Sequence, residues 1–181
     1  MKEREKNSMT RIEKVGLDKL GVVWGLIEED SKWLSEEKKL DHWSDWYTRD
    51  RVAEKFVDWD IYLAYRGENL VGTMAVSEKK VGYYLQENIE MFSDPEARAL
   101  YVSMLAVRPE FQGQGVATDL LKSAEDIAKN KGIKYVRFDC REEYVELVNF
   151  YLNRGYENRG SFPEAENENY LMMEKELVDV K

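Results

Sequence analysis

Hydrophobic and polar residues follow two periods along this chain, and the shorter period predicts the strands. Residues 10–15 alternate polar and apolar side chains, as a strand with one buried face does. Two apolar runs flank Gly67-Glu68-Asn69, a combination typical of a β-hairpin. The largely apolar run Ala99–Val107 is predicted to be the central strand. The predicted strands are residues 10–15, 61–66, 70–77, 99–107, 135–140, 156–161 and 170–177.

Apolar positions three and four residues apart predict the helices. Residues 118–131 are amphipathic, and Gly132 follows at the position that commonly ends a helix. Asp18 stands at the N-cap position of a helix predicted over residues 18–29. Further helices are predicted over residues 51–57 and over residues 144–154, where Gly155 follows. Two segments break the pattern: residues 31–50, rich in charge and aromatic side chains, and residues 78–98, where we expect a short strand or helical turn.

This order of elements, with short crossovers, is typical of a mixed α/β (α+β) protein. We expect one central mixed sheet flanked by helices on both faces. We expect a single domain over residues 1–181, with residues 1–9 as a frayed N-terminal end.

Charge and cysteine content then limit the partners, cofactors and cellular locations that the chain can be expected to have. The chain has 181 residues and a formal net charge of −9, which disfavours nucleic acid as a partner and is compatible with a cationic amine substrate. It contains one cysteine and therefore no internal disulfide, which favours a cytoplasmic location. One histidine and one cysteine do not make a zinc site, so no metal is expected. No apolar run is long enough to span a bilayer.

A glycine-bearing loop joins the central strand to the amphipathic helix. Residues 108–117 read Arg-Pro-Glu-Phe-Gln-Gly-Gln-Gly-Val-Ala. The first amides of a helix have no intrahelical partner, and with the helix dipole they suit a phosphate or pyrophosphate. Gly113 and Gly115 permit a tight bend and a close approach by the ligand. The loop lacks the Gly-Lys-Ser/Thr of a P-loop and the three-glycine dinucleotide fingerprint. An ordinary strand-to-helix turn is the alternative interpretation.

This stretch resembles the acyl-CoA loop of the GNAT superfamily of N-acetyltransferases. The family pattern Gln/Arg-x-x-Gly-x-Gly/Ala is matched by Gln112, Gly115 and Ala117. The flanking residues 104–111, 138–140 and 147–156 also resemble the family's strands four and five and its final helix. The resemblance implies acetyl-CoA as cofactor, with its pantetheine arm in a gap between the central strands. The implied cofactor-binding residues are Leu105, Ala106, Val107, Gln112, Gly113, Gln114, Gly115, Val116, Ala117 and Tyr151.

The resemblance also implies a catalytic acid. Tyr151 matches the family's tyrosine near the CoA sulfur. A free thiol has a pKa of about 8.5 and a phenol about 10, so a nearby phenol can protonate the departing thiolate at modest cost. The alternative is a tyrosine whose ring packs in the core.

The general base is harder to assign, because the family's strand-four glutamate is missing. Tyr101, Ser103 and Met104 occupy that region, and none is a base at neutral pH. We take Glu90 as the candidate base. The other candidates are Glu87, Asp94, Glu142, Asp41 and His42, and each is otherwise an ordinary surface residue. An amine with a lowered pKa needs no dedicated base.

Three further positions carry open alternatives. Tyr144 stands where relatives commonly have asparagine, which puts cofactor contacts from that position in doubt. Cys140 is expected to be a buried, inert thiol, since direct transfer needs no enzyme thiol. The aromatic segment either packs a helix onto the sheet or, with Asp41 and Asp45, holds a cationic amine; its rings are Trp33, Trp43, Trp46 and Tyr47.

Together these features predict an acetyl-CoA-dependent N-acetyltransferase. The acceptor, a small-molecule or peptide primary amine, would attack the thioester directly, through a tetrahedral oxyanion stabilised by the N–H of Leu105 or Ala106. The alternative is a non-catalytic acyl-CoA-binding sensor or interaction module. Nucleic acid and membrane are not expected as partners. Dimers are common in the resembled family, but the sequence identifies no interface.

Overall fold

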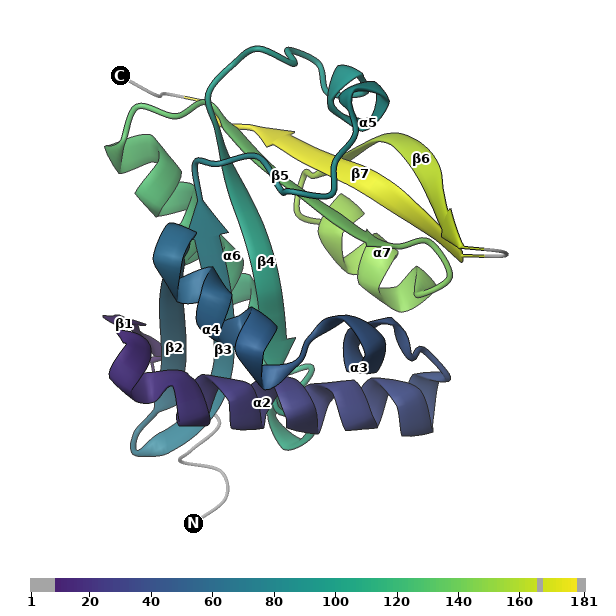
Figure 1. Cartoon of the computed structure of the whole chain (residues 1–181). Helices are drawn as coiled ribbons and strands as arrows, with labels where there is room; N and C mark the ends of the chain where they lie inside the picture. The colour runs from purple at the N-terminus through teal and green to yellow at the C-terminus, as the bar shows by residue number, and fades with distance from the viewer. Residues whose placement is uncertain (1–8, 166–167, 179–181) are drawn as a thin grey trace. The chain divides into compact units, whose positions relative to one another are not determined.

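The computed structural model describes residues 9–165 and 168–178, and its strands form one mixed sheet (Figure 1). The hydrogen-bonded order of the seven strands is β1-β2-β3-β4-β5-β7-β6. The β4–β5 pair is parallel, whereas β1–β2, β2–β3, β5–β7 and β6–β7 are antiparallel. The strands are β1 (Arg11–Val15), β2 (Asp60–Arg66), β3 (Asn69–Ser77), β4 (Ala99–Val107), β5 (Tyr135–Arg141), β6 (Glu157–Ala165) and β7 (Glu168–Glu176).

Helices and single turns connect these strands. Three short turns are the 3₁₀ turns η1 (Leu17–Lys19) and η3 (Pro109–Phe111) and the π-helical turn η2 (Leu34–Lys38). The α-helices are α2 (Leu20–Trp33), α3 (His42–Trp46), α4 (Arg49–Asp58), α5 (Gln86–Glu90), α6 (Val116–Asn130) and α7 (Val145–Leu152). No helix among the described residues is long and apolar enough to cross a membrane.

The chain divides into two compact units. The first, called the N-terminal unit below, contains the chain up to Ser77 together with Ser103–Ser123. Figure 1 shows α2 and α4 over the same face of β2 and β3. Val23, Leu26 and Ile27 of α2 are almost fully buried and belong to one hydrophobic cluster with strand residues of β2, β3 and β4. Each such apolar side chain contributes roughly 1.5–3 kcal/mol on burial, which makes this interface the main support of the unit.

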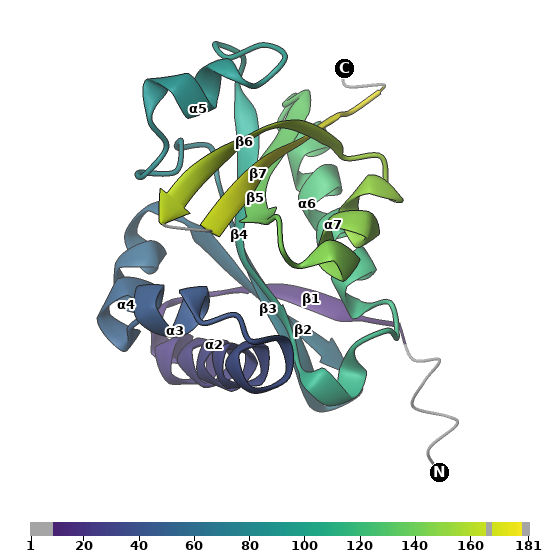
Figure 2. The ribbon, with the colours of Figure 1, turned by 90° about the vertical axis from the view of Figure 1, so that its right-hand side faces the viewer.

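The second unit, called the C-terminal unit, contains Glu78–Val102 and the chain from Ala124 onward. In Figure 2, α5 and its flanking loops lie on one side of β5, β7 and β6, and α7 lies on the other. Phe138 of β5 faces α7, where its ring lies 4.5 Å from that of Tyr151. Side chains alternate along a strand, so Arg137 and Asp139 face the α5 side.

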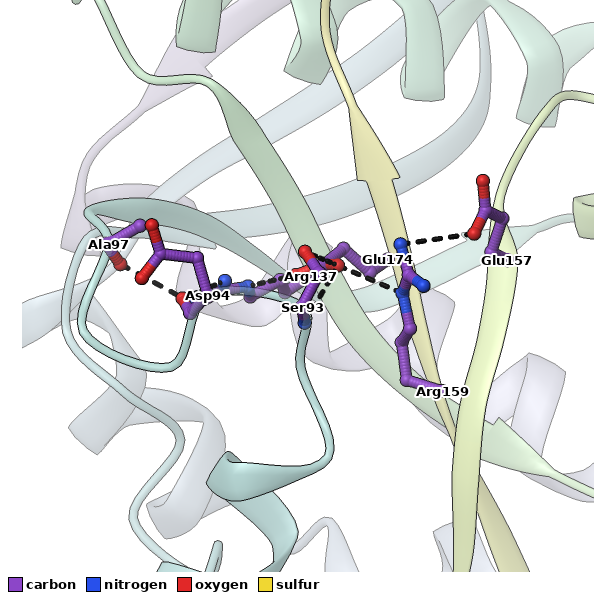
Figure 3. Close-up of polar contacts among 7 residues, drawn as sticks. All are labelled: Ser93, Asp94, Ala97, Arg137, Glu157, Arg159 and Glu174. Atoms are coloured by element: carbon purple, nitrogen blue, oxygen red, sulfur yellow. Dashed lines mark hydrogen bonds and ion pairs between the residues drawn. The ribbon is translucent and has the colours of Figure 1, made fainter.

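A buried ionic network ties the α5 side of this unit together (Figure 3). Arg137 and Glu174 are both fully buried and pair at 2.8 Å. Glu174 also accepts hydrogen bonds from the hydroxyl of Ser93 and from Arg159. The Arg137 guanidinium donates in addition to the carbonyl oxygens of Asp94 and Ala97. The network therefore fixes the loop before β4 onto β5 and β7.

Most predicted elements are confirmed, and three details are wrong. Asp18 is not an N-cap: it lies inside the η1 turn, and α2 begins after it and runs on to Trp33. Residues 31–38 are helical, because α2 runs on into η2, where Leu34 is buried. The predicted loop after residue 161 is strand, since β6 extends to Ala165 and includes Pro163. Proline is tolerated there because β6 is an edge strand.

The assignment of residues 1–181 to a single domain stays a prediction. The frayed N-terminus, predicted over residues 1–9, also stays a prediction, since residues 1–8 lie outside the described residues. Within residues 78–98 the predicted helical turn is present as α5.

Candidate active site

The glycine-bearing loop begins where β4 ends. The amide of Arg108 donates to the carbonyl of Val71 on β3, and Pro109 then opens the η3 turn. Gln112 donates from its side chain back to the carbonyl of Val107 at 3.2 Å. Gln114 does the same to the carbonyl of Glu110 at 2.7 Å. The two glutamine side chains thus brace the loop from within.

Gly113 and Gly115 have the backbone conformation that this bend requires. Their φ angles are 69° and 90°, in the left-handed region that favours glycine. No heavy atom lies within 4 Å of a Cβ built on Gly113, so that side of the loop is open. Gly115 precedes α6, and its carbonyl accepts the amide of Asp119. The amides ahead of Asp119 are therefore those that helix geometry leaves without an intrahelical partner.

Arg66, at the end of β2, supports the loop from behind. Its side chain is about 6% exposed, and Nη2 donates to the carbonyl oxygen of Gln114 at 2.7 Å. Its Nε donates to Thr10, whose hydroxyl in turn donates to the Asp119 carboxylate at 2.6 Å. These contacts lock the start of α6 to the end of β2 and to Thr10, the residue before β1. Sequence reasoning did not single out Arg66, because a charged residue beside a hairpin turn is normally solvated.

The composition of this site fits a pyrophosphate. Arg66 places a positive charge at the N-terminal end of α6, where the helix dipole already favours an anion. Its Nη1 atom is buried and has no hydrogen-bond partner among the described residues. Such an unsatisfied donor costs free energy unless a ligand or water completes it. The loop therefore meets the chemical requirements for the diphosphate of a nucleotide cofactor such as CoA.

The last half of β4 has an irregular backbone. Met104 has a φ of 53°, which is unusual for a non-glycine residue and signals local strain. Leu105 follows it half-buried, while Ala106 and Val107 are buried. Gly72 on β3 packs against this stretch so closely that a Cβ there would meet the Ala106 carbonyl oxygen at 2.7 Å. The strained residue thus directly precedes the amides predicted to stabilise an oxyanion.

Tyr151 lies in the C-terminal unit on α7. It is 5% exposed, and its ring contacts those of Phe138, Phe150 and Tyr156. Tyr156 donates its hydroxyl to Glu125, and burial raises the pKa of Tyr156 above its usual value. The ring of Tyr151 is therefore firmly placed, and its role as an acid stays a prediction. Tyr144 precedes α7 at the N-cap position and makes no capping hydrogen bond with its side chain.

The candidate bases whose side chains the structure describes are surface residues. Glu90 ends α5, is exposed, and accepts a hydrogen bond from Gln86 at 3.1 Å. The side chain of His42 lies outside the described residues, as does that of Asp45. The remaining candidates are also exposed: Glu87, Asp94, Glu142 and Asp41. On β4, Ser103 accepts from Lys55 and shares a hydrogen bond with Tyr47, so it is engaged in packing the N-terminal unit.

The aromatic segment mainly packs α3 and α4. Trp43 and Tyr47 meet edge to face at 5.2 Å and join the hydrophobic cluster of the N-terminal unit. Trp46 and Trp33 each stack on a cation of this chain, Arg51 at 4.4 Å and Lys38 at 5.7 Å. These contacts favour the packing interpretation over an amine-binding role.

Two further titratable groups, Cys140 and Asp30, are buried. Cys140 is buried, as predicted, and burial raises the pKa of its thiol to about 12, so the thiol is inert. Asp30 of α2 is 7% exposed, and burial together with the nearby Glu29 carboxylate raises its pKa to about 7. Across the described ranges, no three histidine, cysteine or acidic side chains are grouped to hold a metal ion.

Comparison with known proteins agrees with this geometry. The model of the acetyltransferase (GNAT) family matches residues 24–156. N-alpha-acetyltransferase 30 of Schizosaccharomyces pombe is 32% identical over 56 residues, 31% of this chain and 37% of that protein. The mouse thialysine N-epsilon-acetyltransferase is 32% identical over 71 residues, 39% of this chain and 41% of that protein. The matched stretches thus span less than half of these relatives.

Solved structures share the fold over nearly the whole chain. The PaiA N-acetyltransferase of Thermoplasma acidophilum, solved with coenzyme A, has a TM-score of 0.68 at 19% identity and covers 93% of this chain and 99% of its own. A GNAT acetyltransferase from Listeria monocytogenes has a TM-score of 0.71 at 16% identity and covers 93% of this chain and 95% of its own. At such identities the likeness establishes the fold.

Proposed function

Because the chain belongs to the acetyltransferase (GNAT) family, we propose that it transfers an acetyl group from acetyl-CoA to a primary amine. The observation that carries the proposal is the loop of residues 112–117, with two positive-φ glycines and the buried Arg66 behind it. Those features together suit the CoA pyrophosphate. In the proposed complex, amides of residues 112–117 bind the pyrophosphate. Leu105, Ala106 and Val107 border the pantetheine arm.

The proposed reaction is direct attack of the neutral amine on the thioester. The carbonyl oxygen becomes an oxyanion, for which the N–H of Leu105 or Ala106, just after the strained Met104, is the proposed donor. Collapse of the tetrahedral intermediate expels the CoA thiolate. Tyr151 is proposed to protonate that thiolate, and a proton from the new amide nitrogen restores the phenol through water.

The acceptor is proposed to be a primary amine because two relatives are named for such groups. One name specifies an α-amine and the other an ε-amine. The net charge of −9 favours a cationic substrate. It also disfavours nucleic acid, and the single cysteine is compatible with the cytoplasm that we propose as location. A homodimer stays a prediction, since nothing in the structure bears on it.

A direct assay separates the enzyme from its alternative, an acyl-CoA-binding sensor without turnover. The protein is incubated with acetyl-CoA and a panel of spermidine, lysine methyl ester and short peptides with free N-termini, and free CoA is followed with time. Amine-dependent CoA release supports the proposal. Calorimetric binding of CoA with no release on any amine supports the sensor, and absence of CoA binding overturns both.

A further inference from the structure

One carboxyl group of the N-terminal unit is buried without a partner. Asp30 of α2 is 7% exposed, and within the described part of the chain its side chain makes no hydrogen bond or ion pair. Buried carboxyl groups in proteins are normally paired or hydrogen-bonded. The Asp30 oxygens are not among the described polar atoms that are both unpartnered and fully sealed from solvent. They therefore keep an edge that water or a small group reaches.

Asp30 lies on the face of α2 that packs on the sheet. Val23, Ile27 and Asp30 follow one another at helical spacing, and all three are buried. Val23 and Ile27 belong to the hydrophobic cluster that also contains Met104 and Ala106 of β4. Asp30 continues this row and lies about 4.5 Å further along the helix axis than Ile27.

The residue before Asp30 ties this turn of α2 to the end of β4. Glu29 pairs with Nε of Arg108 at 3.2 Å, and Arg108 directly follows β4. Figure 1 shows α2 passing the end of β4. Asp30 is therefore held near the last residues of β4, where the N–H of Leu105 or Ala106 is the proposed oxyanion donor. A proton acceptor in this place lies near the thioester carbon that the amine would attack.

Burial and one neighbouring charge set the proton affinity of Asp30. Burial raises its pKa to about 7, and the Glu29 carboxylate adds to the effect. Both protonation states are then populated at neutral pH, as general base catalysis requires. A perturbed carboxyl group without a structural partner is also typical of functional sites.

Other charged groups on the elements packed against α2 have different surroundings. The acidic residues of η1, η2 and α4 are exposed, and β3 carries no titratable residue. Three cations stack on tryptophan rings: Lys38 on Trp33, Arg51 on Trp46 and Lys55 on Trp59. Glu29 is thus the charged neighbour that acts on Asp30, and it is itself paired with Arg108.

We propose that Asp30 is the general base of the transfer and takes a proton from the ammonium group of the acceptor, directly or through one water. The inference rests on the proposed acetyl transfer, whose base the sequence leaves unassigned on β4. An N–H bond of the ammonium breaks and the proton passes to a carboxylate oxygen of Asp30. The neutral nitrogen then forms the C–N bond, and the CoA thiolate leaves as proposed above. The Asp30 carboxylic acid finally releases its proton to solvent, so each turnover yields one proton.

The pH dependence of kcat/KM tests this role. The acceptor is spermidine or, if it releases CoA faster, a short peptide with a free N-terminus. A base must be deprotonated to act, so the wild-type kcat/KM should fall as the pH drops through about 7. In Asp30→Asn it should be about 10²-fold lower or more at neutral pH. Its midpoint should move toward the pKa of the free amine, about 8 for an N-terminus and about 10.4 for an alkylamine.

Two control variants accompany Asp30→Asn. Glu28→Gln removes an exposed carboxylate from the same helix and should leave kcat/KM unchanged. His42 is the single histidine of the chain, and an unperturbed histidine titrates at about 6.5. His42→Asn should therefore keep the wild-type midpoint if Asp30 is the base. Urea unfolding checks that Asp30→Asn is folded, and calorimetry checks that its CoA affinity equals that of the wild type.

A carboxyl NMR signal gives a readout that does not depend on turnover. Aspartate labelled at the side-chain carboxyl carbon is incorporated, and Asp30→Asn identifies the Asp30 signal. The labelled protein, saturated with CoA, is titrated with the same amine. We expect the Asp30 signal to shift and its pKa to fall, because a nearby cation favours the charged carboxylate.

The outcomes separate this inference from the proposed function. Turnover with the same pH midpoint in wild type and Asp30→Asn overturns the inference, even if the rate is lower, and leaves acetyl transfer in place. A midpoint lost in His42→Asn and kept in Asp30→Asn also overturns it, as does an Asp30 signal that does not respond to the amine. If the wild type releases no CoA with any amine, acetyl transfer itself fails, and the inference fails with it.

Discussion

The guanidinium of Arg66 donates a 2.7 Å hydrogen bond from Nη2 to the carbonyl oxygen of Gln114. One buried side chain from the end of β2 therefore controls the orientation of a loop that lies far away in sequence. The adjacent peptide planes of the loop are set by the same contact. Arg66 thus supports the proposed pyrophosphate site by contacting the loop from inside the protein.

Replacement of Arg66 should loosen this arrangement. Lysine keeps the charge but cannot donate in the planar fork that joins Gln114 and Thr10, so Arg66→Lys should weaken CoA binding about tenfold. Calorimetry measures the affinity. Arg49→Lys, an exposed position on α4, is the control and should bind CoA as the wild type does. Unchanged affinity in Arg66→Lys would mean that the loop holds its shape without the fork.

Gly115 should be the least replaceable glycine of the loop. With φ at 90°, an alanine there is strained by about 1–2 kcal/mol, and relief would distort the start of α6. Gly115→Ala should lower both thermal stability and CoA affinity. Gly25→Ala is the matched control: Gly25 is inside α2 with open space around it, so the change should stabilise the protein by up to about 1 kcal/mol. Equal stability changes for the two variants would contradict this account.

Asp30 should make the protein less stable as the pH rises. Its pKa is about 7 in the folded protein and 3.8 as a model value, so the folded state holds the proton more tightly. The destabilisation is absent at acidic pH, grows as pH passes from about 4 to 7, and reaches on the order of 4 kcal/mol above that range. Asp30→Asn should therefore gain stability relative to wild type at about pH 8 but not at about pH 4.

Urea unfolding of both proteins across this pH range measures the effect. Glu28→Gln, an exposed position on the same helix, should show no such pH-dependent gain. A constant difference between wild type and Asp30→Asn at all pH values would show that the Asp30 carboxyl titrates normally.

The buried pair of Arg137 and Glu174 gives a prediction about stability alone. Glu174→Gln removes the charge that compensates a fully buried guanidinium, and should destabilise the protein by about 3–5 kcal/mol. The double variant Arg137→Met/Glu174→Leu removes both fully buried charges, and Arg159 keeps its ion pair with Glu157, so most of that loss should be recovered. Denaturant unfolding of wild type and both variants measures this. A loss below about 1 kcal/mol in Glu174→Gln would show that the buried Arg137 guanidinium does not depend on the charge of Glu174.

The substitution Tyr151→Phe tests directly whether the Tyr151 phenol protonates the CoA thiolate, as proposed. The variant keeps the ring that packs on Phe138 and loses only the hydroxyl, so turnover should fall by about 10²-fold or more while CoA affinity stays within a factor of two or so. Tyr65→Phe, a half-buried tyrosine on β2, is the control for removal of a phenol. Equal turnover in Tyr151→Phe and wild type would remove the acid role.

Regular periodicity explains what the sequence could predict. β4 was predicted with its observed bounds, and α6 within two residues, because their apolar positions repeat without interruption and Gly132 marks the helix end. Residues 31–38 were missed as helix because the charged residues around Leu34 conceal its burial. The glycine loop was recognisable because positive φ angles favour one residue type.

Side-chain partners from distant segments explain what the sequence could not predict. Nothing near Arg66 in sequence indicates that its guanidinium is buried, since Thr10, Gln114 and Asp119 become its neighbours only through the fold. The same holds for Asp139, which lies more than 50 positions along the chain from its partners Tyr83 and Tyr84. Candidate bases chosen by charge alone, such as Glu90, proved to be solvent-exposed.

The left-handed turn at Met104 has a consequence for protein engineering. A single residue with positive φ in a strand shifts the phase of side-chain alternation, so residues after it do not face as a regular strand would place them. If a regular strand from another protein were grafted here by matching its apolar alternation, its side chains from Leu105 onward would point to the wrong face of the sheet. Redesign of this protein must therefore preserve the irregularity itself, along with the close approach of Gly72, before any other residue of this stretch is changed.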